Sequence, residues 1–558
     1  MNVLATKDYI IFLLYFVIVA SYGYWIYMKR KTREHDSKAF FLAEGSLTWW
    51  AIGASLIASN ISAEQFIGMS GNGFFVGVAV AAYEWIAALA LIIIAVWFMP
   101  VYLKNKIYTM PQFLKTRYNE SVALIMAIIW LFVYVFVNLT SILFLGAVAI
   151  TGLLPHDGTD YLHWIMIGLA VFSVIITLGG MKVIGYTDVI QVTVLIIGGF
   201  AAAYMALDKV SGGAGAVAGF STLMKEAPDH FHMILAKPDA NSSQEYINKY
   251  LILPGILMYA AGQWIVNLNY WGCNQYITQR ALGADLQTAR KGILFAGFLK
   301  LMMPLIVMLP GIAAFVLVKQ GQLPPLEKMD DAYSSVLGFL PSGLKGLSIA
   351  ALTAAIVASL AGKANSISTI FTLDIYKKFI NPNAEEKKLV WMGRLVVLVS
   401  MVVAVAFTWK DLLGIGSAGG FTYIQKYTGF ISPGVFAVFI LGMFWKRTTG
   451  AAAVAGIITG LATCFFFNEM APSVFGNETF LYTAYPNGKG GFEIPFLIAM
   501  GISFLFTIIV MVSMSLAGPK INAKAFALDK EMFKLKPSIQ IMIIVTLMIL
   551  AALYIKFW

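Results

Sequence analysis

Runs of roughly twenty apolar residues recur along almost the whole chain, separated by short polar segments. A helix of that length crosses the hydrocarbon core of a bilayer, so the pattern predicts an all-α integral membrane protein. We expect about fourteen spanning helices, at residues 9–28, 49–70, 77–101, 120–152, 161–179, 183–207, 250–273, 291–318, 346–373, 389–408, 418–444, 450–467, 492–517 and 537–557. The segments between them are short, which argues against a membrane-anchored enzyme with a separate catalytic domain.

Two of these spans place small and polar residues at the depth of the bilayer midplane. The second span contains Ala54–Phe66, and the seventh contains Gly262–Tyr276. Irregular backbone at that depth is tolerated where it lines a cavity or binds something, so we expect both helices to be broken at a site. The alternative is that both helices pack through small residues and that their polar groups bond between helices.

The two interrupted spans lie five spans apart, and each opens a block of five. An odd number of spans per block makes the blocks antiparallel, which predicts the inverted repeat of secondary transporters. We therefore divide the chain into an N-terminal span with a basic cytoplasmic loop at 1–48, a first five-helix repeat at 49–208, an external loop at 209–249, a second repeat at 250–444 and three peripheral spans at 445–558.

The composition agrees with a membrane protein, since 59% of the 558 residues are hydrophobic and 12% are charged, about half the charged fraction of a soluble domain. Lysines and arginines concentrate in alternate loops, around Lys31, Lys115, Lys387 and Lys530, which the positive-inside rule places in the cytoplasm. Both termini are then external in a multi-pass plasma membrane protein, and the first span is an anchor, not a cleaved signal peptide. The net charge of +11 thus reflects topology and not nucleic acid binding.

Several other chemistries lack the residues they need. Cys273 and Cys464 form no C-x-x-C pair and the five histidines are scattered, which argues against a structural metal, haem attachment and a disulfide framework. The spans carry no repeated spacing of paired acids or of a nucleophile and base, and no G-x-x-x-x-G-K-[ST] loop is present. We therefore expect no enzyme and no organic cofactor, and an ion gradient as the energy source.

Two ionisable residues fall inside apolar spans, Glu84 in the third and Lys300 in the eighth. Each costs about 2.5–3.5 kcal/mol on insertion scales and needs a partner or a wet cavity. A ligand whose hydroxyls both donate and accept could supply such partners, because a carboxylate, a cation and amides together bind hydroxyls of both kinds. Five spans supply such a set, namely Gln65, Glu84, Asn267, Lys300 and Gln425. The alternative for Glu84 and Lys300 is a structural ion pair between packed helices.

Several stretches of the chain resemble the sodium/solute symporter family, and most of all its sugar-transporting members. They are Ala54–Gly73, Tyr83–Trp85, Tyr186–Gln191, Asn267–Arg280, Phe298–Lys300, Ala355–Ser359, Ser368–Tyr376 and Tyr423–Gly429. The resemblance implies the leucine-transporter-type fold, with a five-plus-five inverted repeat and two broken helices. It also implies sodium-coupled symport of a monosaccharide such as galactose or glucose into the cell by alternating access, in a bacterial inner membrane.

The resemblance further implies roles for single residues. The five polar residues above match sugar-contacting positions, Tyr270 and Trp271 match an inner gate, and Met69, Tyr83 and Phe421 match an outer hydrophobic gate. The coupling sodium ion is implied to bind the backbone carbonyls of Ala58, Ile61 and Ala355 and the hydroxyl of Ser359. Asp188 matches an acidic residue on the inner ion route, and Arg280 matches a basic residue on the cytoplasmic side. The alternative for both is a surface charge at a loop.

The chain departs from the family pattern in its sugar pocket. Ala87 stands where the family has a hydroxyl residue, Lys426 replaces an acidic residue beside Gln425, and Asn269 replaces an aromatic beside Tyr270. These changes keep a sugar as the expected substrate and leave its identity open. Other solutes, such as myo-inositol, sialic acid or a proline-like compound, are alternatives, as is a sugar sensor that does not transport.

The chain also departs from the pattern at the implied sodium site. Ala358 lacks the hydroxyl that the family carries next to Ser359, and Lys363 lies one helical turn beyond Ser359 on the same face. Helical side chains lean toward the helix N-terminus, which aims the ammonium back toward that site. An ammonium that stands in for sodium, with proton-coupled or ion-independent transport, is therefore an alternative to sodium coupling.

Overall fold

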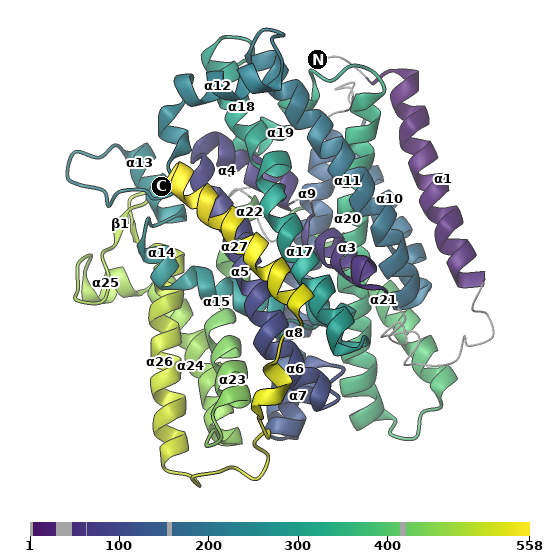
Figure 1. Ribbon diagram of the computed structural model, residues 1–558, viewed down its shortest axis with the longest axis vertical. Helices are drawn as coiled ribbons and strands as arrows, with labels where there is room; N and C mark the ends of the chain where they lie inside the picture. The colour runs from purple at the N-terminus through teal and green to yellow at the C-terminus, as the bar shows by residue number, and fades with distance from the viewer. Residues whose placement is uncertain (1–3, 29–46, 63, 153, 155–158, 413–419) are drawn as a thin grey trace.

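The computed structural model describes residues 4–28, 47–62, 64–152, 154, 159–412 and 420–558. This part of the chain is a bundle of helices with one two-stranded sheet. Figure 1 shows that α1 (Thr6–Met28) begins, and α27 (Pro537–Phe557) ends, toward the same end of the bundle, as an even number of crossings requires. The first basic loop expected from the sequence, around Lys31, lies outside the described residues.

The chain after α1 forms thirteen elements before the connection that follows α11. They are α3 (Trp49–Asn60), η3 (Glu64–Met69), α4 (Ser70–Phe75), η4 (Val78–Ala81), α5 (Ala82–Ile93), η5 (Ile94–Phe98), α6 (Met99–Lys104), α7 (Met110–Arg117), α8 (Glu120–Phe132), η6 (Val133–Leu139), α9 (Thr140–Thr151), α10 (Tyr161–Leu178) and α11 (Gly180–Val210). Here η3, η5 and η6 are short π-helical segments that continue the neighbouring α-helices.

The connection and the second half of the molecule follow. The connection holds α12 (Ala216–Glu226), η7 (Pro228–Phe231) and α13 (Gln244–Ile252). After it come α14 (Leu257–Ala260), α15 (Gly262–Leu268), η8 (Asn269–Cys273), α16 (Gln275–Leu282), α17 (Leu286–Val307), α18 (Leu309–Lys319), η9 (Met329–Asp331), α19 (Ala332–Leu337), α20 (Leu344–Thr369), η10 (Ile370–Ile380), α21 (Glu386–Thr408), α22 (Gly420–Gly429) and α23 (Ser432–Phe444). The peripheral part comprises α24 (Gly450–Glu469), α25 (Ala471–Phe475), β1 (Tyr485–Pro486), β2 (Phe492–Glu493), α26 (Phe496–Leu516), η12 (Lys530–Phe533) and α27.

The described helices match the expected spans closely. Twelve are long and apolar enough to cross a membrane, and they coincide with twelve of the fourteen predicted segments. The seventh span is a pair, Gln244–Ala260 and Gly262–Cys273, bent by 82°. The second span is interrupted as well, because α3 ends at Asn60 and η3 begins at Glu64. Both spans in which small and polar residues interrupt the apolar sequence are therefore broken, as predicted.

The bend in the seventh span arises where two helices approach each other closely. Ala261 adopts φ −127° and ψ −109°, outside the helical region. A Cβ atom on the next residue, Gly262, would lie 2.4 Å from the backbone oxygen of Leu497 in α26. Glycine at this position lets the chain turn directly against α26.

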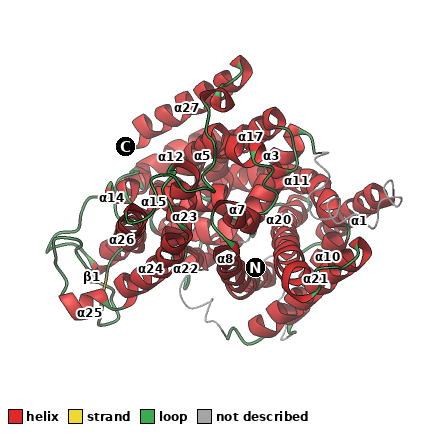
Figure 2. Cartoon of the chain, turned by 90° about the horizontal axis from the view of Figure 1, so that it is seen from below, coloured by secondary structure: helices red, strands yellow, loops and turns green. Residues whose placement is uncertain are grey.

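The buried centre of the bundle is formed by α20, which packs against α11, α10, α1 and α9. The other central packing joins α17 to α3 and α5, so the broken second span lies between α17, α11 and α20. Figure 2, a view along the bundle, shows α24, α26 and α27 on the outside. The connection at 209–249, expected to be an external loop, contains α12 and the first part of α13.

Candidate functional site

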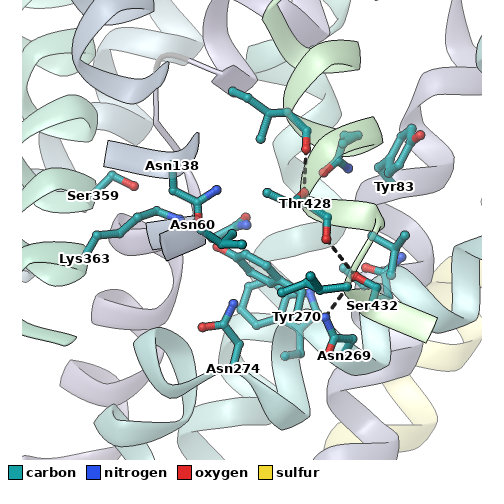
Figure 3. A pocket seen from close by; sticks show the side chains of 18 of the residues that line it. Asn60, Tyr83, Asn138, Asn269, Tyr270, Asn274, Ser359, Lys363, Thr428 and Ser432 are labelled. Atoms are coloured by element: carbon teal, nitrogen blue, oxygen red, sulfur yellow. Dashed lines mark hydrogen bonds between the residues drawn. The ribbon is translucent and has the colours of Figure 1, made fainter. Parts of the chain in front are cut away.

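One cavity lies beside the two broken helices and brings together all five polar residues that the sequence selects. Gln65, Glu84, Asn267, Lys300 and Gln425 line it, and they come from η3, α5, α15, α17 and α22. Figure 3 shows the cavity with polar side chains directed into it from several helices. Residues separated by up to 360 positions in the chain thus form one polar chamber inside an apolar bundle.

Glu84 and Lys300 form an ion pair in the wall of this cavity, with side chains that are 4% and 1% exposed. The ammonium of Lys300 also donates a hydrogen bond to Asn60 Oδ1 at the end of α3. It lies 5.4 Å from the centroid of the Trp271 ring. The structural ion pair considered as an alternative is therefore present, and it borders the cavity at the same time.

The amide side chains in the wall differ in which group, the NH2 or the oxygen, is already bonded within the protein. Gln65 Oε1 accepts hydrogen bonds from the backbone N–H and the hydroxyl of Ser62, at 3.0 and 3.3 Å, so the amide NH2 is the group that Gln65 can donate to a ligand. Asn267 has the opposite arrangement, because its Nδ2 donates to the carbonyl of Gln263 at 2.9 Å and its Oδ1 is left to accept. A cavity with both kinds of group matches hydroxyls that donate and accept.

Three of the five residues expected to form gates line the cavity. They are Tyr83, Tyr270 and Trp271, and the rings of Tyr270 and Trp271 contact each other edge to face with centroids 5.1 Å apart. Met69 is completely buried and is not among the lining residues. The side chain of Phe421 lies outside the described part of the structure.

Sequence reasoning missed six polar residues of the cavity, namely Asn60, Tyr134, Asn138, Asn274, Thr428 and Ser432. Tyr134 and Asn138 belong to η6, a π-helical turn within the fourth span, and the hydroxyl of Tyr134 donates to Asn274 Oδ1. Asn138 is a lone amide in an apolar span, a signal that the sequence offers and that could have identified it. Tyr134 carries no such signal because buried tyrosines are common in helical bundles.

The three departures in the sugar pocket have different structural roles. Ala87 lines the cavity, so the missing hydroxyl leaves space at its wall. Asn269 also lines it and donates a hydrogen bond of 3.0 Å to Ser432 Oγ, which Figure 3 shows. Lys426 instead pairs with Glu469 of α24 at 2.9 Å and is not among the lining residues.

A cluster of oxygen atoms joins the break after α3 to α20. The hydroxyl of Ser359 donates to the backbone carbonyl of Ser59 at 2.7 Å, and the hydroxyl of Tyr276 donates to the same carbonyl. The two hydroxyl oxygens lie 3.0 Å apart. Neutral hydroxyls and carbonyls are the hard ligands that an alkali cation needs, so this donor set fits a sodium ion.

The break also releases backbone carbonyls next to this cluster. In a continuous helix the N–H of Ser62 would bond to the carbonyl of Ala58, but it donates to Gln65 Oε1 instead. The carbonyl of Ala58 therefore lacks the bond that a continuous helix would give it from the N–H of Ser62. Sequence reasoning selected Ala58, Ile61, Ala355 and Ser359, whereas the cluster observed around Ser359 contains Ser59 and Tyr276.

Asp188 and Arg280 face each other in the interior, and neither side chain is exposed. Their nearest charged atoms are 3.9 Å apart, and the hydroxyl of Ser55 bridges them, since it donates to Asp188 at 2.5 Å and accepts from Arg280 Nε at 2.9 Å. The alternative of two surface charges at loops is therefore wrong. The pair lies between α11, α16 and α3, close to the ring of Tyr276, whose centroid is 5.1 Å from the Arg280 guanidinium carbon.

Comparison with known proteins gives consistent results over the whole chain. Residues 40–460 match the model described as the sodium:solute symporter family. The chain is 41% identical over 568 aligned positions to the sodium/glucose cotransporter of Vibrio parahaemolyticus, covering 99% of this chain and 98% of that protein. It is 33% identical to the human sodium/myo-inositol cotransporter 2, covering 81% of this chain and 68% of that protein.

A solved structure shares the fold. The outward-open, substrate-bound structure of a Na+-coupled sialic acid symporter superposes with a TM-score of 0.76 at 20% sequence identity, covering 93% of this chain and 99% of that one. At that identity the likeness concerns the fold, which is the inverted-repeat architecture expected from the two interrupted spans.

Proposed function

Because the chain belongs to the sodium:solute symporter family, we propose that it is a secondary active transporter that carries a monosaccharide together with sodium into the cell. Sodium is the coupling ion, and a hexose such as glucose or galactose is the substrate that the cavity fits best. The proposal draws on the 41% identical relative, whose name states sodium and glucose, and on the chemistry of the cavity.

The observation that carries the proposal is the convergence of five polar side chains from five helices on one buried cavity. Glu84 and Lys300 provide an acceptor and a donor that are already desolvated, and the amides provide the remaining donors and acceptors. We assign the sugar to Gln65, Glu84, Asn267, Lys300 and Gln425. Tyr83 and Tyr270 close the cavity on its two sides, with Met69, Trp271 and Phe421 supporting them.

Coupling to sodium supplies enough free energy for accumulation. One sodium ion gains about 2.3 kcal/mol for 100 mV and about 1.4 kcal/mol for a tenfold gradient, which corresponds to roughly 500-fold accumulation of a neutral sugar. We assign the sodium ion to Ser359 and the carbonyls around the α3 break, including those of Ala58 and Ile61, with Ala355 across from them. Asp188 belongs to the route by which sodium leaves.

The orientation follows from the charge pattern. We propose that the loops around Lys115, Lys387 and Lys530 are cytoplasmic and that both termini are external, in a bacterial inner membrane. The inverted repeat then comprises residues 49–208 and 250–444, and each block opens on a broken span whose break lies near the bilayer midplane.

The test is uptake into proteoliposomes that hold purified protein and an inside-negative potassium diffusion potential. Labelled glucose, galactose and myo-inositol are offered with external sodium or with choline in its place. We expect saturable uptake of one of these solutes that needs sodium and is lost in Glu84→Ala. A sugar substrate would be refuted if none of these solutes is taken up. It would also be refuted if unlabelled proline or sialic acid inhibits the uptake as strongly as the unlabelled sugar does.

A further inference from the structure

Lys363 places a second lysine in the wall of the cavity, besides the Lys300 that pairs with Glu84. It belongs to α20, its side chain is 4% exposed, and it lines the same cavity as Ser359. The two residues are one helical turn apart, and Figure 3 shows both side chains reaching toward Asn60 from the same helix. A positive charge is thus built into the region where the transported cation is assigned.

One aromatic ring connects this charge to the oxygen cluster. The Lys363 ammonium lies 4.4 Å from the centroid of the Tyr276 ring, at a distance typical of a cation–π contact. The hydroxyl of the same ring contacts both Ser359 Oγ and the Ser59 carbonyl. The ammonium and the cluster therefore share one side chain, and a movement of the ring affects both.

The surface of α20 is shaped to hold that ring. A Cβ atom at Gly362 would lie 2.8 Å from Tyr276 Cε2 and 2.4 Å from a terminal nitrogen of Arg280. Glycine lets the ring lie directly against the helix, between Lys363 on one turn and Ser359 on the turn before. The Arg280 charge next to it faces Asp188, and the Lys363 ammonium is a second positive charge over the same Tyr276 ring.

We propose that Lys363 is a tethered cation that competes with sodium for the oxygen cluster of Ser59, Ser359 and Tyr276. The proposal rests on the proposed function and adds how its ion site is tuned. In the absence of sodium the ammonium supplies the positive charge that these oxygens attract. Sodium has to enter against that charge and displace it.

The consequence is a transporter that binds sodium only when the sodium concentration is high. When no sodium is bound, the ammonium keeps the broken helix α3 attached to α20. Two like charges near one cluster repel strongly in a buried site, where screening by water and salt is weak. We expect the repulsion to weaken sodium binding by about ten- to hundredfold. A variant without the ammonium should gain that factor.

The test measures binding of labelled sodium to purified protein in detergent, without sugar, in the wild type and in Lys363→Met. Lys345→Met is the matched control, since it removes a buried lysine from the first turn of the same helix, far from Ser359. We expect the sodium dissociation constant to fall ten- to hundredfold in Lys363→Met and to stay within threefold in Lys345→Met. Lys363→Arg, which keeps the charge, should remain close to the wild type.

Sugar binding in sodium-free buffer separates the other roles that Lys363 could have. An unchanged sodium dissociation constant in a Lys363→Met protein that unfolds at the wild-type temperature overturns the proposal. Loss of sugar affinity without sodium in Lys363→Met also overturns it, because the lysine would then contact the sugar. If neither the wild type nor Lys363→Met binds sodium or sugar, the proposed function fails and this inference fails with it. If Lys363→Met shows sodium-driven uptake and its sodium affinity equals that of the wild type, only this inference fails.

Discussion

The hydroxyl of Ser359 donates a hydrogen bond of 2.7 Å to the backbone carbonyl of Ser59, a residue 300 positions earlier in the chain. The bond joins the centre of α20 to the last turn of α3, where the helix breaks. In the division that we propose, α3 and α20 belong to opposite repeats, so the contact would lie where the two halves of an alternating-access transporter meet. A cation bound there would hold both helices together.

Ser359→Ala should weaken sodium binding by about ten- to hundredfold. The change removes one oxygen ligand and leaves the Ser59 carbonyl with the hydroxyl of Tyr276 alone, a loss of about 1–3 kcal/mol. Binding of labelled sodium to purified protein measures it. Ser366→Ala is the control, because that hydroxyl bonds within its own helix to the carbonyl of Gly362. Equal losses in the two variants would contradict a specific role for Ser359.

The sequence predicts the wall of the cavity better than the oxygen cluster. Glu84 and Lys300 stand out because an ionisable side chain in an apolar span is costly and needs a reason. Tyr276 does not stand out among the 25 tyrosines of the chain. Its role depends on how closely the ring approaches Gly362, which the packing of α16 on α20 determines.

The backbone carbonyls proposed to bind sodium are a second feature that the sequence predicts only in part. Interrupted polar sequence locates the break in the second span, and the structure confirms it. Which carbonyls face α20 depends on the backbone dihedrals of the last turn and on the bond from Ser62 to Gln65. A shift by one residue, from Ala58 to Ser59, turns a helical carbonyl by about 100°, and no periodicity in the sequence encodes that turn.

Gly362→Ala should disturb sodium binding without unfolding the protein. The added methyl meets Tyr276 at 2.8 Å and Arg280 at 2.4 Å, and both side chains must move away from α20. We expect at least a tenfold loss of sodium affinity, measured by labelled sodium binding. Gly168→Ala in α10 is the matched control, since nothing lies within 4 Å of its Cβ position. That variant should be neutral or more stable by up to about 1 kcal/mol.

The connection between the repeats should respond to acid through His230. Burial lowers the pKa of His230 below its usual value, although its Nε2 lies 3.0 Å from the carbonyl oxygen of Phe74. The unfolded chain then binds the proton more readily, so this contribution to stability is present above about pH 6.5 and falls as the pH drops toward the folded pKa.

His230→Gln should remove part of that acid sensitivity. The measurement is the midpoint of thermal unfolding in detergent at pH 8 and pH 5, compared between the wild type and the variant. His232→Gln serves as the control because His232 is exposed. If the drop between the two pH values is the same in His230→Gln as in the wild type, the assignment to His230 is wrong.

Cysteine labelling should find the Lys387 loop inside and the Lys489 loop outside. The two native cysteines, Cys273 and Cys464, are both buried, so background labelling with an impermeant maleimide should be low. Single cysteines at Lys387 and Lys489 are treated in intact cells and then in permeabilised cells. We expect Lys489→Cys to react in both and Lys387→Cys only after permeabilisation. Labelling of Lys387→Cys in intact cells would reverse the proposed orientation.

The Glu84–Lys300 pair should show strong coupling in both stability and sugar binding. Glu84→Gln or Lys300→Met alone leaves one charge buried without its partner, which costs about 3–5 kcal/mol, whereas the double variant removes both charges and should recover much of that loss. Thermal unfolding of the four proteins measures the coupling. The exposed pair Glu531 and Lys534 is the control, and its coupling should be about 0–1 kcal/mol.

Sugar binding distinguishes a ligand-binding pair from a purely structural one. If the pair contacts the sugar, the double variant regains stability but still binds the sugar at least tenfold more weakly than the wild type, because the cavity has lost a carboxylate acceptor and a cationic donor. Isothermal titration with the transported sugar at saturating sodium measures the affinity. A double variant that binds the sugar with wild-type affinity would show that Glu84 and Lys300 hold α5 and α17 together and do no more.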